Sequence, residues 1–192
     1  EDYTIDQSLR FDDGDSAYLS RTPGSAGNRQ IWTFSAWVKR GTQGSEVLFH
    51  AGTSLTGNSG YFDINFQSDG TLKMTTGSTP ILITDAVYRD SSAWYHVVAV
   101  NDSGTFHFYV NGVEPSYSTN VGLGGTDTAI NNTVITHVGV RSYVSGSTYT
   151  DQFFDGYLAE VHFIDGTALD ADSFGETDST TNQWKPIEYD GS

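Results

Sequence analysis

The stretch WTFSAWVKR, residues 32–40, decides the fold class because its apolar side chains recur at every second position. Successive side chains of a β-strand point to opposite faces, so Trp32, Phe34, Ala36 and Val38 are expected to share one face. The same alternation recurs in YFDINFQ (61–67), WYHVVAV (94–100) and TFHFYV (105–110). Gly- and Ser-rich breaks separate these stretches, which predicts many short strands joined by turns.

Helical signals are thin, and turn signals are strong. Asn111-Gly112 predicts a type I′ turn, because both central residues of that turn need positive φ. Residues 168–176 predict one short helical turn with Asp170 as its N-cap, and residues 115–133 read as a long loop. Strands without helices between them predict an all-β fold, a two-sheet antiparallel β-sandwich of the jelly-roll type.

The composition excludes several classes of partner. The 192 residues suit one large domain, and 24 acidic against 9 basic residues give a net charge of −15. Such an acidic surface repels phosphate backbones and anionic lipids, so we expect no nucleic-acid partner. No apolar run approaches the roughly 20 residues of a membrane helix, so we expect no membrane insertion. Without cysteine, the chain has neither disulfides nor thiolate metal sites.

Several stretches together carry a resemblance to a known family. They occur in the order SLRFDDGDSAYLSR (8–21), WTFSAWVKR (32–40), AWYHVVAV (93–100), FYVNGVE (108–114), HVGVRS (137–142) and FDGYLAEVHFIDGTAL (154–169). This set resembles the laminin-G-like, concanavalin A-type jelly-roll modules. With FGETDSTTNQWKPIEYDG (174–191), it is most similar to the version in structural and tail-associated proteins of marine bacteriophages.

The resemblance implies a domain over residues 1–175 and a polar C-terminal extension over 176–192 that leads into further domains of a longer parent protein. It also implies a virion or extracellular location and a glycan- or surface-binding sandwich, in some relatives with one calcium ion at the rim. Fold alone does not give function, so each site needs its own residues.

The catalytic pattern of the fold's glucanases is absent. Retaining glucanases need two carboxylates about 5–5.5 Å apart, which on one strand requires acids of equal parity. YLAEVHFIDG (157–166) supplies Glu160 and Asp165, which have opposite parity, while Glu160 and His162 are either an acid/base pair or structural. The five histidines show no HxH or HxxxH spacing for a transition metal. We expect no enzyme.

Calcium requires six to eight oxygen ligands, which loops rich in Asp supply. RFDDGDSAY (10–18) places Asp12, Asp13 and Asp15 around Gly14, and Asp155 stands beside Gly156. If these segments meet at one edge, the four carboxylates could share a structural Ca²⁺. The alternative is a solvated acidic turn.

Saccharides are held by aromatic stacking and polar side chains, which directs attention to exposed tyrosines. Tyr143 and Tyr149 lie in a Gly/Ser-rich stretch beside Arg141 and are predicted to contact a glycan at the rim. Tyr109 and Tyr95 are predicted to line an exposed sheet face, or else to form a second half of the core.

Three functions follow from this reading. The first is a non-catalytic module that attaches a phage particle to a polysaccharide or cell-surface glycan. The second is a purely structural virion decoration or spacer domain, whose partners are other virion proteins or further copies in an oligomer. The third, least favoured, is a polysaccharide-degrading enzyme with an unrecognised arrangement.

Overall fold

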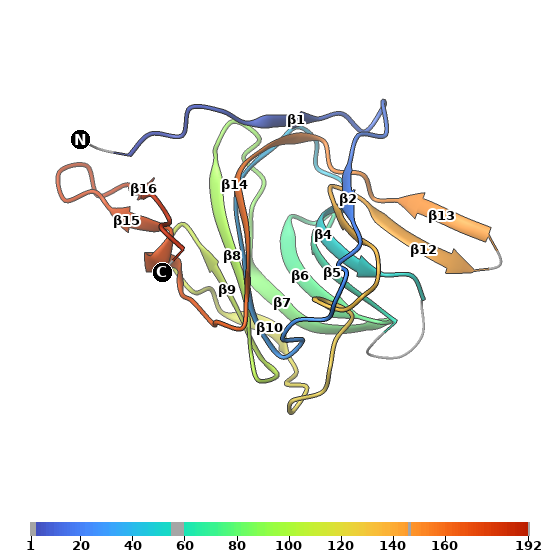
Figure 1. Ribbon diagram of the computed structural model, residues 1–192. Helices are drawn as coiled ribbons and strands as arrows, with labels where there is room; N and C mark the ends of the chain where they lie inside the picture. The colour runs from blue at the N-terminus through green and yellow to red at the C-terminus, as the bar shows by residue number, and fades with distance from the viewer. Residues whose placement is uncertain (1–2, 55–59, 146, 192) are drawn as a thin grey trace.

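The chain folds into two antiparallel sheets that pack face to face, as the period-2 pattern predicts (Figure 1). The computed structural model describes residues 3–54, 60–145 and 147–191, and the side chains of 143–149 are outside that description. The five-stranded sheet has the order β1 (Leu9–Phe11), β14 (Gly156–Asp165), β3 (Ile31–Arg40), β8 (Tyr95–Asp102) and β9 (Thr105–Val110). The seven-stranded sheet has the order β10 (Tyr117–Asn120), β7 (Thr79–Val87), β6 (Thr71–Thr76), β5 (Tyr61–Phe66), β4 (Glu46–Gly52), β11 (Thr136–Val138) and β2 (Leu19–Arg21).

Two short hairpins and one helical turn complete the fold. One hairpin pairs β12 (Arg141–Ser145) with β13 (Ser147–Asp151), and the other pairs β15 (Gly175–Thr177) with β16 (Trp184–Pro186). The helical turn is a 3-10 helix over Ala171–Ser173. Asp170 occupies its N-cap position, as expected, but its side chain makes no capping hydrogen bond. No helix in the described chain is long and apolar enough to cross a membrane.

The main core lies between the two sheets and contains the residues that the alternation assigns to the inside. Trp32, Phe34, Ala36 and Val38 of β3 are fully buried in it. From the opposite sheet, Phe62, Ile64 and Phe66 of β5 meet them, with Trp32 and Phe62 in edge-to-face contact at 5.4 Å. The apolar half of each strand thus forms the core, and the other half faces outward.

The outward half of the five-stranded sheet is covered by the C-terminal segment rather than by solvent. Figure 1 shows β15 and β16 on the side of β8 and β9 that faces away from the seven-stranded sheet. There His96 lies between Trp37 and Trp184, with ring centroids 5.0 and 6.0 Å away. Trp184 Nε1 donates to His96 Nδ1 at 3.0 Å, and Ser35 Oγ lies 2.9 Å from His96 Nε2. Burial, with a smaller effect from the charge of His162, lowers the pKa of His96 to about 4.

The connection after β9 differs from its prediction. Asn111 and Gly112 both adopt positive φ, 49° and 79°, and Val110 bridges to Val113 across them, which confirms the turn. The following residues 115–133 were expected to form a loop, but they contain strand β10, which pairs with β7 at the edge of the seven-stranded sheet. The turn therefore carries the chain from one sheet to the other.

Candidate functional site

A row of polar residues crosses the outer face of the seven-stranded sheet. His137 of β11 pairs with His50 of β4, His50 with Asp63 of β5, and Asp63 with Thr75 of β6, each as direct cross-strand partners. These four residues, called the polar row here, occupy outward positions because their strand neighbours Phe49, Phe62 and Met74 belong to the core. All four are buried, with at most 6% of any of them exposed.

His50 and Asp63 form a tightly bonded pair at the centre of the polar row. Their Nδ1 and Oδ1 atoms are 2.6 Å apart, and His50 Nε2 lies 2.9 Å from the carbonyl oxygen of Gly52. The rings of Tyr61 and His137 flank His50, with centroids at 5.9 and 5.6 Å.

Two basic side chains border the polar row. Arg141 donates to both carboxylate oxygens of Asp151, at 2.8 and 2.7 Å, and its Nη1 lies 3.9 Å from Asp63 Oδ2. Burial acts to lower the pKa of Arg141, but the hydrogen bonds to Asp151 and the charge of Asp63 outweigh it and raise the pKa. Burial also lowers the pKa of the half-buried Lys73, which is the cross-strand partner of Asn65.

Three buried polar atoms on this face have no hydrogen-bond partner among the described residues. They are Asn65 Oδ1, Thr75 Oγ1 and His137 Nδ1. A buried polar atom without a partner costs about 1–3 kcal/mol, so native proteins keep few of them. Asn65 and Thr75 both neighbour Asp63 and Lys73 in the β5–β6 pairing. These donors and acceptors are buried, so bound water can satisfy them, and a polar ligand would reach them only by displacing what covers them.

The β12–β13 hairpin lies on the same side of the molecule as the polar row and brings part of the predicted glycan site to it. Figure 1 shows the hairpin projecting from the seven-stranded sheet on the side away from the five-stranded sheet. Tyr143 and Tyr149 are direct cross-strand partners in its backbone, although their side chains lie outside the described residues. Arg141, the third residue predicted for this site, joins the hairpin to Asp63.

Tyr95 and Tyr109 are not brought together. Tyr95 points into the main core, where its ring meets Tyr88 at 5.6 Å and its hydroxyl accepts from the backbone N–H of Asp90 at 3.0 Å. Tyr109 lies on the opposite face of the five-stranded sheet, stacked on His107 and packed against the smaller apolar cluster under the C-terminal segment. No single exposed face presents both rings.

The predicted acidic group forms at the edge where β1 pairs with β14. Asp12, Asp13 and Asp155 each place a carboxylate oxygen within 4.8 Å of the other two. Burial, followed by the charges of Asp13 and Asp12, raises the pKa of Asp155, as expected for carboxylates held together. Asp15 is not part of this group. Three carboxylates are suitable ligands for Ca²⁺, which takes its remaining oxygens from backbone carbonyls or water.

Glu160 and His162 contact each other, and Asp165 is engaged elsewhere. Glu160 Oε2 lies 3.2 Å from His162 Nε2, and Glu160 itself adopts a φ of 47° at a bulge in β14. Asp165 Oδ1 accepts from the backbone N–H of Asn28 at 2.7 Å and from the side chain of Asn131 at 2.6 Å. The strand thus holds Glu160 beside a histidine and ties Asp165 to two loops.

Sequence reasoning did not identify the polar row. Each of His50, Asp63 and His137 stands alone in its own strand, and only the cross-strand register places them in line. The signal that could have found them is the single charged residue at the outward position of YFDINFQ, together with a histidine at the matching position of the preceding strand.

Comparisons with known proteins agree with this architecture. Residues 12–173 match the family model described as the Concanavalin A-like lectin/glucanases superfamily. No curated protein matches the chain. Among solved structures, domains LG4-5 of the mouse laminin α1 chain align with a TM-score of 0.59 at 15% identity, over 98% of this chain and 46% of that one.

Two further structures are similar. A heptameric SAP-like pentraxin from Limulus polyphemus aligns with a TM-score of 0.55 at 20% identity, over 76% of this chain and 68% of that one. The sialidase CBM40 of Ruminococcus gnavus bound to α2,3 sialyllactose aligns with a TM-score of 0.54 at 16% identity, over 80% of this chain and 95% of that one. At these identities the similarity shows the fold.

Proposed function

The chain belongs to the concanavalin A-like lectin/glucanases superfamily, and we propose that it is a non-catalytic carbohydrate-binding module. The observation that carries the proposal is the polar row, with the unpartnered atoms of its members Thr75 and His137 and of the neighbouring Asn65. Saccharide hydroxyls both donate and accept hydrogen bonds. They can therefore donate to Asn65 Oδ1 and exchange a hydrogen bond with the Thr75 hydroxyl.

The ligand that fits best carries a carboxylate. Lys73 is half-buried, and no carboxylate of the described residues lies within ion-pair distance of its ammonium group. A ligand carboxylate would offset the desolvation that lowers the pKa of Lys73. The presence of sialyllactose on a structural neighbour is consistent with an acidic saccharide. Tyr143 and Tyr149 stay the residues that the sequence predicts to contact the ligand at the rim.

The finer assignment is a module of a phage virion protein that mediates attachment to a host or environmental glycan. It rests on the resemblance of FGETDSTTNQWKPIEYDG (174–191) to the phage version of the module, and it places the domain on the virion or outside the cell. Within that assignment, Ca²⁺ held by Asp12, Asp13 and Asp155 would fix the β1–β14 edge.

The test is retention of the purified domain on immobilised acidic and neutral saccharides, including sialyllactose and bacterial-surface and algal polysaccharides, in calcium. We expect selective retention of one acidic class. Lys73→Met or Thr75→Val should weaken it at least about tenfold, whereas Arg89→Gln, on an exposed turn, should leave it unchanged. Tyr143→Ala and Tyr149→Ala should weaken it as well.

Other results would refute the proposal. Absence of retention on every saccharide would favour the purely structural domain. Release of new reducing ends from a retained polysaccharide would establish the enzyme instead.

A further inference from the structure

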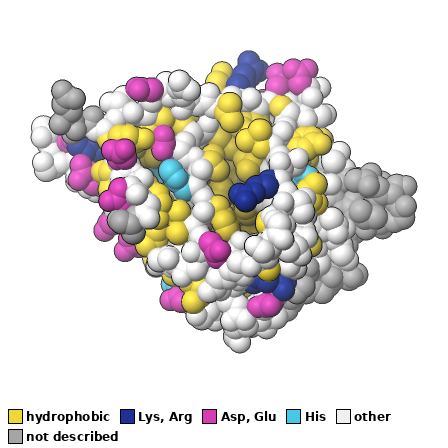
Figure 2. All heavy atoms as spheres, viewed as in Figure 1, with side chains coloured by type: hydrophobic (Ala, Val, Ile, Leu, Met, Phe, Trp, Pro, Cys, Tyr) yellow, Lys and Arg dark blue, Asp and Glu magenta, His cyan; other side chains and the backbone are white. Residues whose placement is uncertain are grey.

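A groove separates the two sheets along one edge of the sandwich. It has a volume of about 530 Å³ and lies between β14 and β2. Its apolar lining includes Phe49, Val138 and Phe163, with Val161 and Leu19 at its two lips. Figure 2 shows the hollow with an apolar floor, in the region where Figure 1 places β14 and β2. A smaller hollow of about 220 Å³, also lined by Leu19 and Val161, continues it toward β1.

The lips of this groove expose large aliphatic side chains. Leu19 is 50% exposed and Val161 is 41% exposed. The bulge at Glu160 shifts the register of β14 between Ala159 and His162. Exposed apolar side chains that border an apolar groove, unlike ones scattered singly, are a feature of binding grooves on soluble proteins.

One lip also presents unpaired backbone. The inner side of β14 pairs with β3 as far as Asp165, but its outer side pairs with β1 only from Gly156 to Leu158. Within the described chain, the outer edge of residues 160–164 therefore has no strand beside it. Glu160 lies at the bulge with a φ of 47°, so the extended part of this edge is residues 161–164, which spans roughly 13 Å at 3.3 Å per residue. An open strand edge of this length is a template for one more strand.

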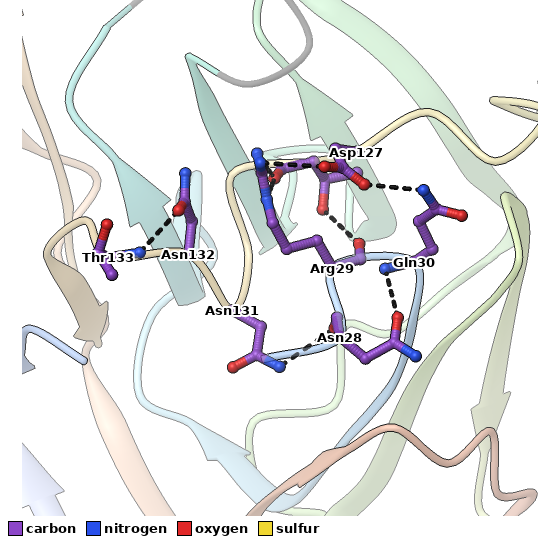
Figure 3. Close-up of polar contacts among 8 residues, drawn as sticks. Asn28, Arg29, Gln30, Asp127, Asn131, Asn132 and Thr133 are labelled. Carbon is purple, nitrogen blue, oxygen red and sulfur yellow. Dashed lines mark hydrogen bonds and ion pairs between the residues drawn. The ribbon is translucent and has the colours of Figure 1, made fainter. Parts of the chain in front are cut away.

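The far end of the groove is a fixed wall. Asn131 donates to the carbonyl oxygen of Asn28 at 3.1 Å, and Arg29 and Gln30 both bond to Asp127 (Figure 3). Asn131 also donates to Asp165. These bonds join residues 28–30 to residues 127–131, and Gly27, whose N–H donates to the carbonyl oxygen of Asn131 at 2.9 Å, lies beside Asp165 at the end of β14. The open edge is thus bounded by β1 at one end and by this wall at the other.

The positive charge of Arg21 in the groove favours an acidic group at one position of a bound ligand. Arg21 lines the groove and is exposed, and no carboxylate of the described residues lies within ion-pair distance of its guanidinium. Asp165, the acidic residue at the same end, already accepts two hydrogen bonds. An occupant therefore meets a basic group beside an apolar floor, and an acidic side chain is complementary to it.

We propose that this groove binds an extended peptide segment of a partner protein, which adds as a strand to the outer edge of β14 in line with β1. Its alternate side chains are aliphatic and lie on the floor formed by Phe49, Val138 and Phe163. One floor-facing position near the Asp165 end is Asp or Glu and pairs with Arg21. A saccharide fits this floor poorly, because its hydroxyls would find few partners there. The inference is independent of the proposed glycan site.

The test is selection of random eight-residue peptides displayed on ribosomes against the wild-type domain. Val161→Lys places a charge at the lip and serves for counter-selection. Val113→Lys, a comparable change at a valine that is 67% exposed in the turn after β9, is the matched control. We expect enrichment of peptides with alternating aliphatic residues and one acid, which bind wild type and Val113→Lys alike and Val161→Lys at least tenfold more weakly.

A charge exchange tests the register. Arg21→Glu should weaken the enriched peptide at least tenfold in fluorescence anisotropy, and replacing the peptide's acid by lysine should restore binding. Methylation of the backbone amides that face β14 should abolish binding. Saccharide retention should be unchanged in Val161→Lys.

Three results would overturn the proposal. One is a lack of enrichment over Val161→Lys, and another is equal binding of the backbone-methylated peptide. The third is a wild-type dimer, seen by sedimentation, that Val161→Lys dissociates, since it would show that a second copy covers this edge.

Discussion

If Asp12, Asp13 and Asp155 bind Ca²⁺, calcium should raise Tm by an amount that can be worked out. Extracellular calcium modules have Kd values on the order of 10⁻⁴–10⁻³ M, so about 10 mM Ca²⁺ is roughly 10–100 times Kd. Binding to the folded state then adds RT ln(1 + [L]/Kd), which is about 1.4–2.7 kcal/mol. For a domain of this size, each kcal/mol raises Tm by about 2–4 °C. We expect Tm in calcium to exceed Tm in chelator by roughly 3–11 °C.

The structure supplies a matched pair of variants for this measurement. Asp155→Asn removes one of the three converging carboxylates and should abolish the shift, whereas Asp15→Asn, outside the group, should retain it. Differential scanning calorimetry at constant ionic strength separates binding from charge screening. Equal Tm values in calcium and in chelator for the wild type, or equal shifts in both variants, would refute the site.

The acidic group also has a pH signature in chelator. Because burial and the neighbouring carboxylates raise the folded-state pKa of Asp155 above its ordinary value, this residue binds its proton more tightly in the folded than in the unfolded chain. Its contribution to stability should therefore improve as pH falls through the folded pKa and level off below about 3.8. Asp155→Asn should remove that contribution and leave the metal-free protein at least as stable as the wild type near neutral pH.

Three further predictions concern stability. In the wild type, the buried Glu46 lies 2.7 Å from Arg40 Nε, and Arg40→Met leaves its carboxylate without this cation. We expect the substitution to lower the free energy of unfolding in urea by about 3–5 kcal/mol, and the double variant Arg40→Met, Glu46→Gln to lose less. Equal losses would contradict the ion-pair argument. Gly112→Ala should lower the free energy of unfolding by about 2–4 kcal/mol, because φ is +79° and the new Cβ would lie 2.4 Å from Trp184. Gly24→Ala, whose Cβ would have no heavy atom within 4 Å, should leave it unchanged. The pKa values of His96 and His137 are both lowered to about 4, so between about pH 6 and 4.5 the unfolded chain binds up to two more protons than the folded chain. The free energy of unfolding should therefore fall by up to about 2.7 kcal/mol for each pH unit of acidification in this range. A flat pH profile would be inconsistent with neutral buried rings.

The sequence predicts the inside of the sandwich well, because the core-facing positions need only the alternation within one strand. It predicts less well which outward-facing side chains are exposed, since that depends on the cross-strand register and on the segments that cover each sheet. Val98 pairs with Tyr109 in the antiparallel β8–β9 register, which puts Tyr109 on the face of Val98 and leaves Tyr95 in the core. Likewise, Ser35 and Trp37 alternate outward, yet both are buried against His96 and, beyond it, Trp184.

The two long-range sites differ in the same way. Asp12, Asp13 and Asp155 could be grouped from the sequence because the N- and C-terminal strands of such sandwiches lie side by side, and β1 does pair with β14. Asp15 was included because it is close in sequence, but its carboxylate is not part of the group. The polar row could not be assembled, because its members lie on four strands whose order is set by the whole topology.

The contrast between the two outer faces argues for where a ligand binds. On the outer face of the five-stranded sheet, both nitrogens of His96 have partners and aromatic rings cover it. On the seven-stranded sheet, equally buried atoms of Asn65, Thr75 and His137 have none. Side chains of the same types could supply hydrogen-bond partners to the buried polar atoms of the second face as well. Trp32 Nε1 and Asn101 Nδ2 in the core also have no partner among the described residues, so it is the grouping of such atoms beside Lys73 and Asp63 that favours a polar ligand, or water that a ligand displaces.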